Sequence, residues 1–164
     1  MSARYSTWIR IGGRIERSDV DPLLKAITKA YVSLEWGEPP FKPTAADELL
    51  DARQQDGWLW LCDQEAKYGE FPELEETCRR LGLPYTRFAE GWCGCDPELL
   101  DWRPGMKEPL IRTGSNDDCE KTFVATDSVN EALTALEAGH VQQAVSMLRK
   151  LCPEVAELPP FEIV

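Results

Sequence analysis

The stretch RYSTWIRIGGRIE, residues 4–16, decides how this chain folds. Its residues alternate between two faces, which is the pattern of a β-strand with one buried side. One face carries Tyr5, Thr7, Ile9, Ile11 and Ile15, and the other carries Arg4, Arg10, Arg14 and Glu16. Gly12-Gly13 falls inside this alternation and predicts a bulge or bend. We therefore expect a strand at the start of the chain whose apolar side is covered by other elements.

Helical periodicity follows in the segments 18–34, 44–55 and 71–82. Apolar side chains recur every three or four residues in the first and last of these, which predicts amphipathic helices. The first two segments open on capping-box pairs, Ser18 with Asp21 and Thr44 with Asp47. The third begins at a proline and ends before Gly82, a natural helix stop.

Strand patterns occupy residues 58–66, 84–92, 98–103 and 121–127. Residues 128–154 have helical spacing that breaks at Gly139-His140, so they form one bent helix or a helix pair. A proline-rich tail, residues 152–164, is expected to be extended. The order of elements predicts a single α+β domain over residues 1–164, with a mostly antiparallel sheet of four to five strands. Helices pack on this sheet, and the chain ends in a helix or helical hairpin before the tail.

Charge is distributed unevenly along the 164 residues. The formal net charge is −11, with +3 in residues 1–34, −10 in residues 35–101 and −4 in the remainder. Nucleic-acid affinity comes mainly from Lys and Arg on phosphates, so direct binding to DNA or RNA is disfavoured. A one-signed surface steers opposite charges toward it, so a basic protein is the expected partner.

No apolar run is long enough to span a bilayer, and the first residues lack the features of a signal peptide. These observations predict a cytoplasmic protein without membrane contact. In a reducing compartment the six cysteines are expected to be free thiols.

The expected partner-binding surface combines the acidic middle of the chain with one loop tryptophan. Trp36 lies beside two glutamates just after a helix, and tryptophan is enriched where proteins anchor one another. The alternative is that Trp36 folds back on its own core. The predicted partner-binding residues are Glu35, Trp36, Glu38, Asp47, Glu48, Asp51, Glu70, Glu73, Glu75 and Glu76.

The motif Cys93-Gly94-Cys95 is the one close pair of cysteines. Residues two apart on a strand share a face, so both sulfurs can reach one metal ion. A structural zinc site needs four ligands, and no second short pair is present. The alternatives are a functional thiol pair or a hairpin corner closed by Asp96-Pro97. The lone histidine, His140, is expected to end or cap a helix rather than act in catalysis.

Two functions follow from these patterns. The first is a non-enzymatic acidic interaction module, a stoichiometric inhibitor or decoy that occupies the basic nucleic-acid-binding surface of another protein. Small anti-CRISPR and anti-restriction proteins of phages and mobile elements act in this way, and the similarity here is one of size and charge alone. The alternative is a thiol- or zinc-dependent enzyme or metal-binding protein that uses Cys93 and Cys95. The first function requires no cofactor, and both leave the oligomeric state open.

Overall fold

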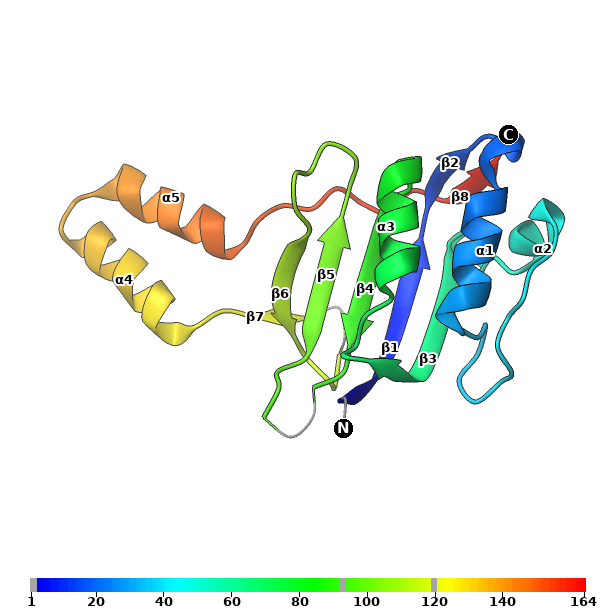
Figure 1. Ribbon diagram of the computed structural model, residues 1–164. Helices are drawn as coiled ribbons and strands as arrows, with labels where there is room; N and C mark the ends of the chain where they lie inside the picture. The colour runs from blue at the N-terminus through cyan, green and yellow to red at the C-terminus, as the bar shows by residue number, and fades with distance from the viewer. Residues whose placement is uncertain (1–2, 92–93, 119–120) are drawn as a thin grey trace.

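A computed structural model describes residues 3–91, 94–118 and 121–164. Its main part is a six-stranded antiparallel sheet with helices on one face, and a pair of helices extends from one side (Figure 1). The strands are β1 (Arg4–Ile11), β2 (Gly13–Ile15), β3 (Leu59–Lys67), β4 (Tyr85–Ala89), β5 (Glu98–Trp102), β6 (Leu110–Gly114), β7 (Thr122–Phe123) and β8 (Phe161–Ile163). The helices are a 3₁₀ turn (Arg17–Asp19), α1 (Asp21–Ala30), α2 (Ala46–Asp51), α3 (Pro72–Leu81), α4 (Thr126–Glu137) and α5 (Val141–Leu151).

The sheet order is β3-β1-β4-β5-β6-β7, and every neighbouring pair is antiparallel. The α+β class and the antiparallel sheet are therefore confirmed. The sheet has six strands because the segment after the β5 turn adds β6, in which Ile111 is exposed and Leu110 only half-buried. A strand with so little burial carries a weak alternation of apolar and polar residues.

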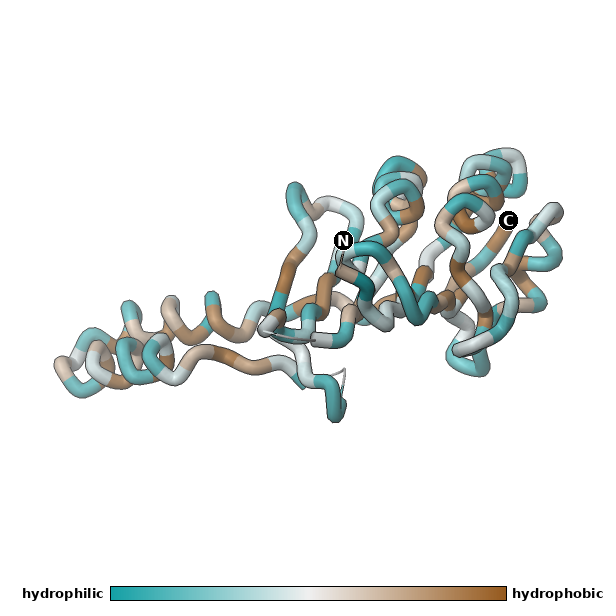
Figure 2. The backbone as a smooth tube through the Cα atoms, turned by 60° about the horizontal axis from the view of Figure 1, so that its bottom comes forward, coloured by the Kyte–Doolittle hydropathy of each residue, from teal (hydrophilic) through white to brown (hydrophobic). Residues whose placement is uncertain are grey.

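The main core lies between the sheet and helices α1 and α3, which Figure 2 shows together on one side of the sheet. Ile9 and Ile11 of β1 and Leu59 and Leu61 of β3 are fully buried there. In β3 the residues that alternate with these leucines, Trp60 and Cys62, point to the opposite face of the sheet, as the two-residue period requires.

The bend predicted at Gly12-Gly13 separates β1 from β2, and the C-terminal tail fills the space beside it. A Cβ at Gly12 would lie 2.0 Å from the Pro159 carbonyl oxygen, so only glycine permits this approach. β8 then pairs in parallel with β2, with Phe161 fully buried. The tail runs behind the sheet in the view of Figure 1, so it packs as a structural part of the fold.

The helix ends agree only in part with the predicted caps. Gly82 adopts φ +70 and ends α3 as expected, and the Leu83 amide donates to the Cys78 carbonyl at 2.9 Å. The Ser18–Asp21 capping box is wrong, because Asp21 already belongs to α1 and the Ser18 hydroxyl donates to Asp19. The Thr44 hydroxyl instead bonds the Glu48 carboxylate at 2.6 Å, one position beyond the expected partner.

The last two helices form an antiparallel pair, which we call the arm (residues 126–151). Gly139 has φ +80 and lies in the short turn between α4 and α5, so the segment is a helix pair and not one bent helix. α4 and α5 pack chiefly on each other. Within the described residues, no helix has both the length and the apolar character needed to cross a membrane.

The buried end of the tail yields a stability prediction. Phe161→Ala should lower the free energy of unfolding by about 3–5 kcal/mol, because it empties a fully enclosed site. Urea denaturation of the full chain measures this loss. Val164→Ala is the matched control, since Val164 is largely exposed, and it should change stability by about 0.5 kcal/mol or less. Equal effects of the two substitutions would mean that the tail does not contribute to the core.

Candidate functional site

The sheet face opposite α1 and α3 carries a second, smaller hydrophobic cluster. Trp8, Cys62, Phe88 and Leu99 are buried in it, and Trp60 packs against them. The register places Cys62, Trp8, Phe88 and Leu99 in one row across β3, β1, β4 and β5. Trp8 and Phe88 stack with ring centroids 5.9 Å apart. This face is therefore aromatic where a solvent-facing sheet is usually polar.

Trp36 reaches this face because the loop after α1 is attached to the outer edge of β3. Ser33 and Cys62 exchange two backbone hydrogen bonds, of 2.7 and 2.9 Å. The loop then places Trp36 edge-on to Trp60, with ring centroids 5.7 Å apart. Trp36 nevertheless keeps 42% of its surface exposed. It is thus neither a core residue nor an isolated surface residue, but one wall of a hollow.

Two hollows share Trp36, and together we call them the aromatic groove. The first, of about 550 Å³, is lined by Arg10, Leu34, Glu35, Trp36, Gln54, Asp56, Trp58 and Trp60. The second, of about 620 Å³, is lined by Ser6, Trp8, Trp36, Gln64, Phe88, Glu90, Asn116, Asp117 and Asp118. Four tryptophans from distant parts of the sequence therefore meet on one face of the sheet.

A guanidinium group already lies among these rings. The Cζ atom of Arg10 is 4.6 Å from the centroid of the Trp8 ring and 5.1 Å from that of Trp58. Both distances are within the range of cation–π attraction. The groove therefore accommodates an arginine head group between indole rings.

Carboxylates surround the aromatic floor. The side chains of Glu35, Asp56, Glu90 and Asp117 form no ion pair with any residue that the structure describes, whereas Asp118 pairs with Lys121 at 3.0 Å. Asn116 closes one end, where its amide bonds the Gly91 backbone at 2.9 and 3.0 Å. The groove combines flat aromatic surfaces with carboxylates, four of which form no ion pair within the described ranges of the chain.

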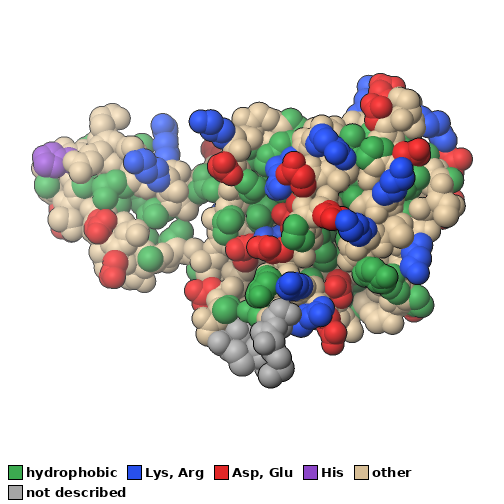
Figure 3. All heavy atoms as spheres, viewed as in Figure 1, with side chains coloured by type: hydrophobic (Ala, Val, Ile, Leu, Met, Phe, Trp, Pro, Cys, Tyr) green, Lys and Arg blue, Asp and Glu red, His purple; other side chains and the backbone are tan. Residues whose placement is uncertain are grey.

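Most of the predicted acidic residues on helices lie elsewhere, and several are paired. Asp47 bonds Arg17 at 2.9 Å, Glu76 bonds Arg79 at 3.0 Å, and Glu73 bonds Lys29. Figure 3 shows acidic and basic side chains interleaved over this helical face. The hydroxyl and amide of Thr44 donate to Glu48 and hold its pKa below the ordinary value. These helices therefore do not present an uninterrupted row of negative charge.

The other three predicted carboxylates, Glu38, Asp51 and Glu70, are exposed and form no ion pair within the described part of the chain. None of them lines the groove. Of the ten predicted partner-binding residues, the structure brings only Glu35 and Trp36 into it. Asp56, which belongs to the acidic middle of the chain that was expected to face a partner, also lines the groove. The groove residues that the sequence did not indicate include Arg10, Trp58 and Trp60, which come from two distant segments that the pairing of β1 with β3 brings together.

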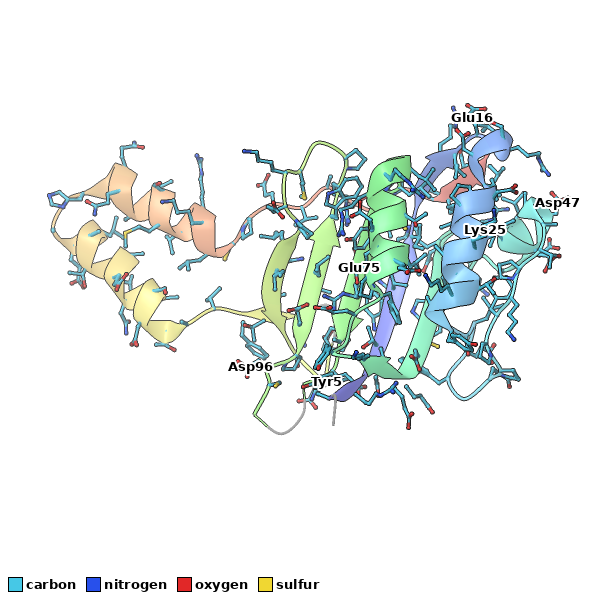
Figure 4. The ribbon with its side chains drawn as sticks, viewed as in Figure 1. Tyr5, Glu16, Lys25, Asp47, Glu75 and Asp96 are labelled. Atoms are coloured by element: carbon cyan, nitrogen blue, oxygen red, sulfur yellow. The ribbon has the colours of Figure 1, made fainter. Side chains whose placement is uncertain are left out.

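The prediction that Glu75 faces a partner needs correction, because this side chain is buried between α3 and the sheet (Figure 4). Its carboxylate lies 3.0 Å from Arg87 Nε, accepts from the Phe71 amide at 3.0 Å and from the Tyr85 hydroxyl at 3.3 Å. Arg87 also binds Glu98 and the Gly69 carbonyl. Burial raises the pKa of Tyr85, and the Glu75 charge adds to this effect. The spacing of Glu75 could have indicated this burial. Glu75 lies four residues after Phe71 and three before Cys78, which places it on the inner side of α3.

The cysteine hypothesis receives no geometric support from the described residues. Cys93 lies outside them, so the pair with Cys95 is not placed, and Cys95 is exposed. Among the residues with described positions, no three His, Cys, Asp or Glu side chains are gathered closely enough to hold a metal ion. His140 lies in the turn of the arm, next to the first residue of α5.

Comparisons with protein-family models, with curated proteins and with solved structures gave no significant match.

The buried position of Glu75 predicts a large difference between neighbouring glutamates. Glu75→Ala leaves Arg87 in the core with one partner fewer, and should cost about 3–5 kcal/mol of stability. Glu76→Ala removes only an exposed pair and should cost about 1 kcal/mol or less. Chemical denaturation of the two variants tests this. Comparable losses would contradict the buried ion pair.

Burial also predicts which thiols react. Burial raises the pKa of Cys62 to about 12, with Asp63 and Glu35 adding to the shift, and burial likewise raises the pKa of Cys78. The thiolate is the nucleophile, so both should resist an aromatic disulfide reagent at neutral pH, while the exposed Cys95 and Cys152 react quickly. Peptide mapping after brief labelling measures the order, and denaturant should abolish it. Rapid labelling of Cys62 in the folded protein would be inconsistent with its buried position.

Proposed function

We propose that this protein is a non-enzymatic interaction module that binds an arginine-rich segment of another protein in the aromatic groove. The observation that carries the proposal is the combination of Trp36, Trp58 and Trp60 with carboxylates that form no ion pair among the residues whose positions the structure describes. An indole ring and a nearby carboxylate recognise different features of the same guanidinium. The ring attracts its flat face, and the carboxylate accepts its N–H groups.

The position of Arg10 supports this choice of ligand. Its guanidinium lies over Trp8 and Trp58, so the groove has the shape and polarity that such a group requires. Arg10 also lowers the local negative charge, but the carboxylates that line the groove outnumber it. An incoming arginine therefore meets net attraction together with a free indole surface at Trp36.

The proposed biological role is stoichiometric inhibition. Basic surfaces that bind DNA or RNA are rich in arginine, and a protein that occupies such a surface excludes the nucleic acid. The groove carboxylates, rather than those on α2 and α3, would take the place of phosphates in this decoy. An origin in a phage or mobile element would be consistent with such an anti-defence role and forms part of the same proposal.

Tryptophan fluorescence offers a direct test, because four tryptophans line the groove. Titration with a nona-arginine peptide should give a saturable change at a ratio of one to one, weakening as salt is added. Trp36→Ala and the pair Glu35→Gln/Asp56→Asn should each weaken binding by about tenfold. A nona-lysine peptide should bind less well, because an ammonium group has no planar face to stack.

The matched control is Glu73→Gln/Glu76→Gln, which removes the same number of charges from the helical face and should leave affinity unchanged. Circular dichroism verifies that each variant is folded. If the peptide does not bind, or if the helical variant weakens binding as much as the groove variant, the proposed groove is not the contact surface.

A further inference from the structure

The aromatic groove runs along the direction of the strands. The residues that β1 and the β3 segment contribute to it all point to one face of the sheet, and they are Ser6, Trp8, Arg10, Trp58, Trp60 and Gln64. In the register of the two strands Arg10 lies opposite Trp60. The first hollow therefore lies at the Trp58 end and the second at the Gln64 end, and they meet at Trp36. At about 3.3 Å per residue, the groove is about 20 Å long from Trp58 to Gln64.

Carboxylates occur at both ends of this length. Glu35 and Asp56 line the first hollow, and Glu90 and Asp117 line the second. None of these four side chains forms an ion pair with another residue in the described ranges. A single guanidinium group reaches the carboxylates of one hollow only. A ligand that compensates both hollows therefore needs basic side chains along its length.

The spacing of the floor favours one conformation of such a ligand. Side chains on one face of a strand repeat every two residues, or about every 6.7 Å. An extended peptide has the same repeat, so side chains at every second position stay in step with the floor. A helix is about 10–12 Å wide and its side chains on one face repeat about every 5.4 Å. Along a floor of about 20 Å the helical repeat falls out of step.

We propose that the groove takes an extended segment in which every second residue is arginine, so that guanidinium groups on one side of the segment occupy both hollows. In the first hollow a guanidinium meets indole rings together with Glu35 and Asp56. In the second it meets Trp36 and Phe88 together with Glu90. The residues between the arginines point away from the groove. This inference rests on the proposed function, because it specifies the ligand of the same groove.

Two peptides of identical composition test the spacing. The peptide RTRTRTRT places all four arginines on one side of an extended chain. The peptide RTTRRTTR places two on each side of an extended chain, and all four on one face of a helix. Both carry the same charge, so attraction by charge alone would give equal affinities. Titration followed by tryptophan fluorescence should show that RTRTRTRT binds about tenfold more tightly or better.

Variants of the protein test whether the ligand spans both hollows. Glu35→Gln/Asp56→Asn and Glu90→Gln/Asp117→Asn should each weaken binding of RTRTRTRT by about tenfold, because each pair removes carboxylates from one hollow. The matched control is Asp51→Asn/Glu70→Gln, which removes two exposed carboxylates outside the groove and should leave the affinity unchanged. Circular dichroism verifies that each variant is folded.

The nona-arginine peptide separates the failure of this inference from that of the proposed function. If nona-arginine binds but RTRTRTRT does not bind more tightly than RTTRRTTR, the alternating spacing is wrong and the groove remains a binding site. An unchanged affinity in the Glu90→Gln/Asp117→Asn variant likewise overturns the inference, because the ligand then occupies one hollow only. If nona-arginine itself does not bind, the proposed function is rejected together with this inference.

Discussion

The fold depends on the position of β1, which pairs with β3 on one edge and with β4 on the other. A central strand has both edges paired, and its side chains point alternately to the two faces of the sheet. Ile9 and Ile11 lie beneath the helices, while Trp8 and Arg10 lie on the opposite face. The same alternation therefore builds the main core and the floor of the aromatic groove. Groove and core are two sides of one strand, which gives the groove a rigid base.

The buried pair of Glu75 and Arg87 connects the layers of this structure. Arg87 comes from the middle strand β4 and reaches Glu75 on α3 and Glu98 on β5. Because charges are costly to bury singly, each of these groups requires the others to remain in place. Glu75, one of the acidic residues in the middle of the chain, is thus part of the interior. The net charge of a sequence does not say which carboxylates remain exposed at the surface.

Three parts of the molecule use charge differently. On the helical face, carboxylates such as Glu73 and Glu76 pair with nearby cations, which lowers the field that a distant partner would sense. In the groove, Glu35 and Asp56 have no such partner among the described residues and lie beside indole rings. The arm is almost neutral as a whole but divided between an acidic and a basic helix.

Patterns that depend on near neighbours were readable from the sequence. The strands around Ile9 and Leu61, the helix that ends at Gly82 and the break at Gly139 all follow from periodicity and from the backbone freedom of glycine. Strand β6 and the capping pair at Ser18 were not predicted correctly, because exposed strands and helix starts carry weak local signals. The class of fold and the sign of the total charge were thus properties of the sequence by itself.

Only the tertiary structure decided which residues meet. Trp36, Trp58 and Trp60 come together with Trp8 because β1 and β3 pair in one particular register and a loop crosses the edge of β3. Glu75 and Glu76 look alike in the sequence, yet a rotation of 100° about the helix axis separates a buried ion pair from an exposed one. Burial and pairing are relations between distant parts of a chain, and local composition does not contain them.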